Sequence, residues 1–107
     1  MTAIIDPSNL TIEASGRVVR FTRCEFAIIM ALIKAGGRCL TFGFLCDLMN
    51  EITGKEAWVE SLRVHKVRAS QKLSKVGLSI QSHYGIGYSM AKPSVLILPT
   101  AEEELAA

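Results

Sequence analysis

The feature that most constrains the fold is a long stretch, residues 57–76, that contains neither glycine nor proline. Within it, side chains recur at steps of three and four residues, which places them on one face of a helix. The members of this stripe are Trp58, Leu62, His65, Ala69, Leu73 and Val76. Gly77 follows directly and is a typical C-terminal cap. We therefore predict one long helix with a buried face and a polar face.

A second helix is predicted at about residues 23–35. Thr22 and Glu25 have the spacing of a capping box, in which each side chain bonds a free backbone amide of the first turn. An apolar face follows at helical spacing, formed by Phe26, Ile29, Met30 and Ile33. The glycine pair at 36–37 ends this helix.

A third, shorter helix is predicted between these two. Thr41 is a plausible N-cap, and the apolar stripe consists of Leu45, Leu48 and Met49. We expect this helix to end near Asn50. Residues 51–56 are polar and include Gly54, so they are predicted to form a loop.

Short β-prone segments stand at both ends of the chain. Residues 10–13 and 18–21 suit an N-terminal hairpin, in a sheet of two or three strands, and residues 78–83 and 88–90 flank a glycine-rich turn. Residues 94–98 suit a last strand, which either pairs with the N-terminal sheet or forms a dimer contact. The order of elements predicts an α+β winged helix-turn-helix, with short N-terminal antiparallel strands, three helices and a C-terminal β-hairpin wing.

Length and composition agree with one domain. The chain has 107 residues, half of them apolar, which is enough for one modest core. We assign residues 1–92 to the winged-helix domain and residues 93–107 to a C-terminal strand and acidic tail. No apolar run approaches the roughly 18–20 residues that span a bilayer. With no signal peptide, we expect a cytoplasmic protein without a membrane partner.

The residue pattern does not indicate a disulfide framework, a metal site or a catalytic site. Cys24, Cys39 and Cys46 are an odd number without CxxC spacing, and we expect reduced thiols. They form no local ligand pair with His65 or His83, so we expect no metal and no other cofactor. Neither G-x-S-x-G nor H-E-x-x-H occurs, and no acidic pair lies in an apolar setting. An enzyme is therefore not expected.

Positive charge is concentrated in one part of the chain. The net charge is only +2, but residues 61–92 contain no Asp or Glu. The basic residues there are Arg63, Lys66, Arg68, Lys72, Lys75 and Lys92, whereas Glu102, Glu103 and Glu104 lie in the tail. This asymmetry is typical of a phosphate-binding surface, and the alternative is a simply solvated helix face.

Three sequence stretches resemble one known family, the OmpR/PhoB-type winged-helix domains, and together they cover about residues 10–90. Residues 19–26, VRFTRCEF, are similar to the family's strand-to-helix stretch. Val64-His65 followed by Lys72-Leu73 resembles the recognition-helix pattern V-H-I…L-R-x-K-L. Residues 80–88, IQSHYGIGY, are similar to the wing, I-x-T-x-x-G-x-G-Y. The resemblance implies sequence-specific binding to double-stranded DNA by a bacterial-type transcription regulator.

The chain also departs from the family pattern. Lys66 replaces an apolar core residue, Ala69 a Leu, and Ser70 an Arg that usually meets the phosphate backbone. Tyr84 stands at the wing tip, where the family often has Arg. No receiver domain precedes the winged helix, so we expect a stand-alone protein without phosphorylation-driven control.

The predicted long helix has two dissimilar faces. Leu62, Ala69 and Leu73 point one way, and a mixed set lies near the opposite side: Glu60, Val64, Val67, Arg68, Gln71 and Lys75. Two valines on a solvated face are unusual in a structural helix. On a helix in the major groove they contact thymine methyl groups while Arg68 and Gln71 bond base edges. The resemblance places base contacts at Val64 and Arg68.

The remaining candidate residues are expected to position the DNA. Arg63, Lys66, Lys72 and Lys75 are predicted phosphate contacts, with plain solubility as the alternative. His65 is either a core histidine or a phosphate donor. The resemblance assigns Ser82 to a phosphate, and Tyr84 is expected to reach the minor groove or the backbone. Tyr88 is predicted to pack against the long helix.

Partners follow from this interpretation. The resemblance implies that the loop at 50–57 touches RNA polymerase and that two copies pair on direct repeats of DNA. The rival hypothesis is a winged-helix protein-interaction module that docks on a regulator or on RNA polymerase without binding DNA. Lys66, Ser70 and Tyr84 favour the rival because they depart from the DNA-binding pattern.

Overall fold

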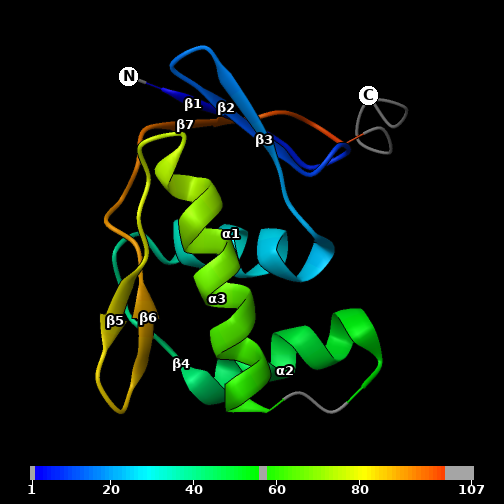
Figure 1. The fold of residues 1–107 in the computed structure, drawn as a ribbon, viewed down its shortest axis with the longest axis vertical. Helices are drawn as coiled ribbons and strands as arrows, with labels where there is room; N and C mark the ends of the chain where they lie inside the picture. The colour runs from blue at the N-terminus through cyan, green and yellow to red at the C-terminus, as the bar shows by residue number, and fades with distance from the viewer. Residues whose placement is uncertain (1, 56–57, 101–107) are drawn as a thin grey trace.

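A computed structural model describes residues 2–55 and 58–100 and shows two small sheets around three helices (Figure 1). The first sheet contains β1 (Ala3–Asp6), β2 (Thr11–Ala14), β3 (Arg17–Arg20) and β7 (Val95–Ile97), in the order β3-β2-β1-β7. Its first three strands are antiparallel, and β7 runs parallel to β1. Ile5, Ile12 and Val19 lie in register across it and are buried. Successive side chains of a strand alternate between faces, so this row covers the helices.

The first sheet corrects one expectation and confirms another. It has four strands rather than two or three, because β1 adds to the predicted hairpin and β7 joins from the far end of the chain. The prediction that residues 94–98 either pair with this sheet or form a dimer contact is confirmed in its first form.

The helices are α1 (Arg23–Ala35), α2 (Phe42–Thr53) and α3 (Val59–Ser74). The bounds of α1 and its capping box are as predicted, and Gly36 adopts the left-handed conformation that ends the helix. The prediction for α2 was wrong at its end. Residues 51–53 are helical rather than loop, and Gly54 caps them with a φ of 70°. Positive φ is accessible to glycine at little cost.

The wing belongs to a second sheet that contains β4 (Leu40–Thr41), β5 (Gln81–His83) and β6 (Gly87–Ser89), in the order β4-β6-β5. The predicted strand at 78–83 is thus shorter, and β4 was not expected. A Cβ on Gly87 would collide with the backbone of Leu40 and Thr41, so only glycine allows β4 to approach β6. The wing is therefore attached to the segment that leads into α2.

One apolar core joins the first sheet to the helices. Its fully buried members include Ile28 and Leu32 on α1, Leu45 on α2, and Leu62 and Leu73 on α3. Because all three helices contribute, the inner face of α3 is fixed against α1 and α2. The opposite face of α3 is left outward.

Candidate nucleic-acid interface

Helix α3 presents the two faces that its sequence predicts. Leu62, Ala69 and Leu73 are each 0% exposed and anchor the helix, and Val76 just beyond it is buried as well. The expectation for Trp58 was wrong. It occupies the N-cap position before the first turn and is 62% exposed, so it does not continue the buried stripe. Ala57 lies outside the described residues.

The outward face of α3 forms a continuous surface of mixed chemistry. Five side chains line a shallow hollow of about 390 Å³, namely Arg63, Val64, Val67, Arg68 and Gln71. All five are exposed, and Val64 and Val67 are 49% exposed each. The four residues predicted to face base edges are thus side by side. Apolar and hydrogen-bonding side chains thus lie within one hollow. In a major groove, apolar side chains contact thymine methyl groups and hydrogen-bonding side chains contact base edges.

The predicted phosphate contacts divide into two groups. Arg63 and Lys75 are exposed at the two ends of the outward face. Lys66 is half-buried, and its ammonium lies 5.5 Å from the centre of the Tyr88 ring. This cation–π contact connects α3 to the wing and confirms that Tyr88 packs against α3.

Lys72 is held by the protein itself. Its Nζ atom donates a hydrogen bond of 2.6 Å to Oε1 of Glu25, and it also lies 5.7 Å from the Phe21 ring centre. Glu25 is 1% exposed, and the same Oε1 accepts from the Thr22 amide in the capping box. Lys72 thus neutralises a buried carboxylate.

The pKa of Glu25 reflects this balance. Burial raises the pKa of the carboxyl, but the hydrogen bond from Lys72, the bonds from Thr22 and the Lys72 charge together outweigh burial. The pKa therefore lies below its ordinary value, and Glu25 is charged at neutral pH. Sequence reasoning recognised Glu25 as a helix cap but missed its second role. Its partner is 47 positions away, so only the packing of α1 on α3 brings the two together.

His65 and Ser70 lie on the flanks of α3. Both are half-buried, and His65 Nδ1 and Ser70 Oγ have no hydrogen-bond partner among residues 2–55 and 58–100. His65 thus lies on the edge of the buried face of α3. Ser70 supplies no charge where the resembling family has Arg.

The wing places two candidate residues beside the N-terminal half of α3. Ser82 is exposed on β5, and Tyr84 projects fully from the tip, where Gly85 makes the turn with a φ of 71°. Arg63, Ser82 and Tyr84 help to line one hollow of about 350 Å³ between α3 and the wing. An arginine and a hydroxyl that face one hollow are a suitable pair for a phosphate group.

Tyr88 closes the floor of this hollow. It is 5% exposed, and its ring meets Phe42 edge-on at 5.4 Å between centres. Burial raises the pKa of the Tyr88 hydroxyl, against the charge of Arg63 and a hydrogen bond that its guanidinium donates. Tyr88 therefore belongs to the packing between α3 and the wing.

The possible metal ligands, the thiols and the helix lengths in the described part of the chain are as follows. No group of three His, Cys, Asp or Glu side chains there is placed to hold a metal ion. Cys24 and Cys46 are buried, and burial raises the pKa of both thiols, which keeps them protonated. Among the described helices, none has the length and apolar character needed to cross a membrane.

Comparison with known proteins gives matches among solved structures alone. No protein-family model matches the chain, and no curated protein does. The DNA-binding domain of response regulator AdeR, solved in complex with an intercistronic region, matches with a TM-score of 0.69 and 22% identity, over 87% of this chain and 97% of that one. The C-terminal domain of the lantibiotic response regulator NsrR, a nisin resistance regulator, matches with a TM-score of 0.72 and 16% identity, over 85% and 93%.

The DNA-binding domain of Bacillus subtilis CssR also matches, with a TM-score of 0.60 and 19% identity, over 75% of this chain and 89% of that one. The chain has the winged-helix fold. The fold class predicted from the order of elements and from the OmpR/PhoB-type resemblance is confirmed. In this winged helix, α3 is the third helix, and β5 and β6 form the wing hairpin that follows it.

Proposed function

We propose that this winged helix binds double-stranded DNA sequence-specifically and acts as a bacterial-type transcription regulator in the cytoplasm. The observation that carries the proposal is the outward face of α3. There Val64, Val67, Arg68 and Gln71 are exposed together on a helix whose inner face is fixed in the core. The match to the AdeR domain, which was solved with an intercistronic region, supports it at the level of fold.

The proposed interface divides into reading and positioning groups. Val64, Val67, Arg68 and Gln71 face the bases of the major groove. Arg63, Lys66, His65, Lys75, Ser82 and Tyr84 contact the phosphate backbone, with Tyr84 reaching the backbone or the minor groove from the wing tip. Lys72 is left out of this set, because its ammonium already neutralises Glu25.

Two further partners are part of the proposal. The segment between α2 and α3 contacts RNA polymerase, and Trp58 at 62% exposure gives it a large apolar side chain for such a contact. Glu56 and Ala57 in the same segment lie outside the described residues. Two copies of the domain bind side by side on direct repeats.

A protein-interaction module remains the second candidate. Three observations favour it: Lys66 stacks on Tyr88, Ser70 offers no charge, and Lys72 is bound to Glu25. Each reduces the cationic surface available to phosphates. A module that docks on a regulator or on RNA polymerase needs no such surface.

The test is enrichment of duplex sites from a random library, followed by binding measurements across salt concentrations. With the three cationic phosphate contacts Arg63, Lys66 and Lys75, the slope of log K against log salt is expected to be about −3. Arg68→Ala is expected to weaken specific binding about ten- to a hundredfold and to leave non-specific binding nearly intact. Lys75→Ala is expected to weaken both and to reduce the slope by roughly one unit.

Two results would count against the proposal. No enrichment, with no salt-dependent binding, would favour the protein-interaction module. If Arg68→Ala behaved like Lys75→Ala, α3 would serve as a basic anchor without reading the sequence.

A further inference from the structure

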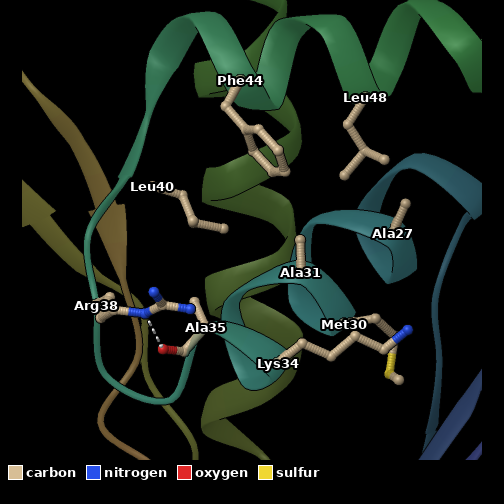
Figure 2. A pocket seen from close by; sticks show the side chains of 9 residues that line it. All are labelled: Ala27, Met30, Ala31, Lys34, Ala35, Arg38, Leu40, Phe44 and Leu48. Carbon is tan, nitrogen blue, oxygen red and sulfur yellow. Dashed lines mark hydrogen bonds between the residues drawn. The ribbon is translucent and has the colours of Figure 1, made fainter.

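An apolar groove runs between α1 and α2, and none of its lining residues belongs to the proposed DNA interface (Figure 2). Its volume is about 470 Å³. The floor is a row of alanines on α1, Ala27, Ala31 and Ala35, and the wall is Phe44 and Leu48 on α2, which point toward that row in Figure 2. Because the inner face of α3 packs on α1 and α2, its outward face is turned away from them.

The wall of this groove is apolar. Phe44 is 53% exposed, although it lies within the first turn of α2 and next to the fully buried Leu45. Leu48, one turn along the same face, is half-buried. The exposed phenyl ring and Leu48 together give the groove an apolar wall that can contact another molecule.

The rim of the groove carries positive charge alone. Lys34 and Arg38 are exposed and stand at the C-terminal end of α1, and no acidic side chain lines the groove. The Nε atom of Arg38 donates a hydrogen bond of 3.1 Å to the Ala35 carbonyl, which holds the guanidinium at the rim. Within residues 2–55 and 58–100, neither cation has a carboxylate partner.

The shape of the groove selects the secondary structure of its occupant. Alanines at four-residue spacing allow the axis of another helix to come close to α1, since the interaxial distance depends on the side chains at the contact. Both long walls are helices, whose backbone groups are bonded internally. The neighbouring strand β4 has two residues, too few for a ladder with an extended peptide.

We propose that this groove docks an acidic amphipathic helix from a partner protein. Large apolar side chains at four-residue spacing enter between Phe44 and the alanine row, and carboxylates on the flank meet Lys34 and Arg38. The winged helix then binds two macromolecules at once, with DNA on the outward face of α3 and the partner helix across α1 and α2. The second contact does not depend on the first.

The test is a selection from a displayed random library of helical peptides on the whole chain, with mixed-sequence duplex DNA in excess to occupy α3. Selected peptides are expected to be acidic, with apolar residues four apart. Their affinity is expected to fall at least tenfold on Phe44→Ala and on the double charge reversal Lys34→Glu/Arg38→Glu. Val18→Ala, at an exposed apolar residue of β3 outside the groove, is the matched control and is expected to leave the peptide affinity unchanged.

Phe44→Ala is informative because Phe44 is 53% exposed, so its melting temperature is expected to stay near that of the wild type. The double charge reversal is expected to lower the melting temperature by a few degrees, because it places two carboxylates at the C-terminal end of α1 and removes the bond from Arg38 to Ala35, so its peptide binding is measured well below its melt. Three outcomes overturn the proposal: no peptide is enriched, enriched peptides carry no acidic bias, or they bind Phe44→Ala as tightly as the wild type. A fourth is a tenfold gain in peptide affinity when residues 101–107 are deleted. In that case the acidic tail of this chain is the occupant, not a partner protein.

Discussion

Removing the Lys72 ammonium is the most informative single perturbation of the fold. Lys72→Met keeps most of the alkyl chain and leaves the Glu25 carboxylate without its cation at 1% exposure. Breaking a buried ion pair from one side costs about 3–5 kcal/mol. The Lys72 side chain is 32% exposed, so the lower end applies, about 3 kcal/mol. For a domain of this size, that corresponds to a fall of roughly 10–15 °C in melting temperature.

The assay is chemical and thermal unfolding of matched variants. Glu25→Gln is expected to lower the free energy of unfolding by less than Lys72→Met does. In Glu25→Gln no charge stays buried, because the Lys72 ammonium can turn to solvent. The double variant is expected to cost less than the sum of the two, as is usual for residues in contact. Lys75→Met, an exposed lysine at the end of α3, is the control and is expected to stay within about 0.5 kcal/mol of the wild type.

Acid adds a second readout with a defined sign. The folded-state pKa of Glu25 is lowered, so its stabilisation is present above the unfolded value of about 4.3 and is lost as pH falls through the folded pKa. In Lys72→Met, burial without a cation raises that pKa, and acid relieves the penalty. The stability difference between the wild type and the variant is therefore expected to shrink from pH 7 to pH 4. A difference below about 0.5 kcal/mol at pH 7 would refute the structural role of the pair and return Lys72 to the phosphate contacts.

Three further predictions concern the ends of the fold and the wing. Truncation after Lys92 removes β7 from its pairing with β1 and is expected to lower the melting temperature; an unchanged melt would contradict its place in the sheet. Gly87→Ala is expected to lower the free energy of unfolding by more than about 2 kcal/mol, because the new Cβ meets the β4 backbone. The control Gly43→Ala places its Cβ in open space and is expected to be tolerated. Similar melting temperatures for the two variants would show that β4 can move away from β6. Tyr84→Ala is expected to keep the melt and to weaken binding to all DNA sequences by a similar factor, and loss on one sequence alone would show that the wing reads bases.

Local signals explain why much of the fold was predictable. The bounds of α1 follow from Thr22, Glu25 and Gly36, which act within one turn of the residues they cap. The inner face of α3 follows from a strict helical spacing. The wing follows from Gly85 and Gly87, of which one makes the turn and the other permits close approach.

The features that the sequence did not predict depend on how separate parts of the chain pack together. Strand β4 has two residues and exists because β6 pairs with it. Trp58 fits the helical spacing but precedes the first turn of α3, so the spacing alone misplaces it. The Lys72–Glu25 pair requires two helices to pack, and the sequence shows only two isolated charges. Of the candidate site, the outward face of α3 was predictable, whereas the use of Lys72 within the fold was not.

The most direct test of the central claim is an NMR titration, in which the backbone amide spectrum of the protein is followed as a DNA duplex selected from the random library is added. The largest chemical-shift changes are expected on residues 63–71 of α3 and on residues 82–86 of the wing. The groove lined by Ala31 and Phe44 is expected to change little. Changes centred on that groove, with α3 unaffected, would contradict the claim that this winged helix reads DNA through α3.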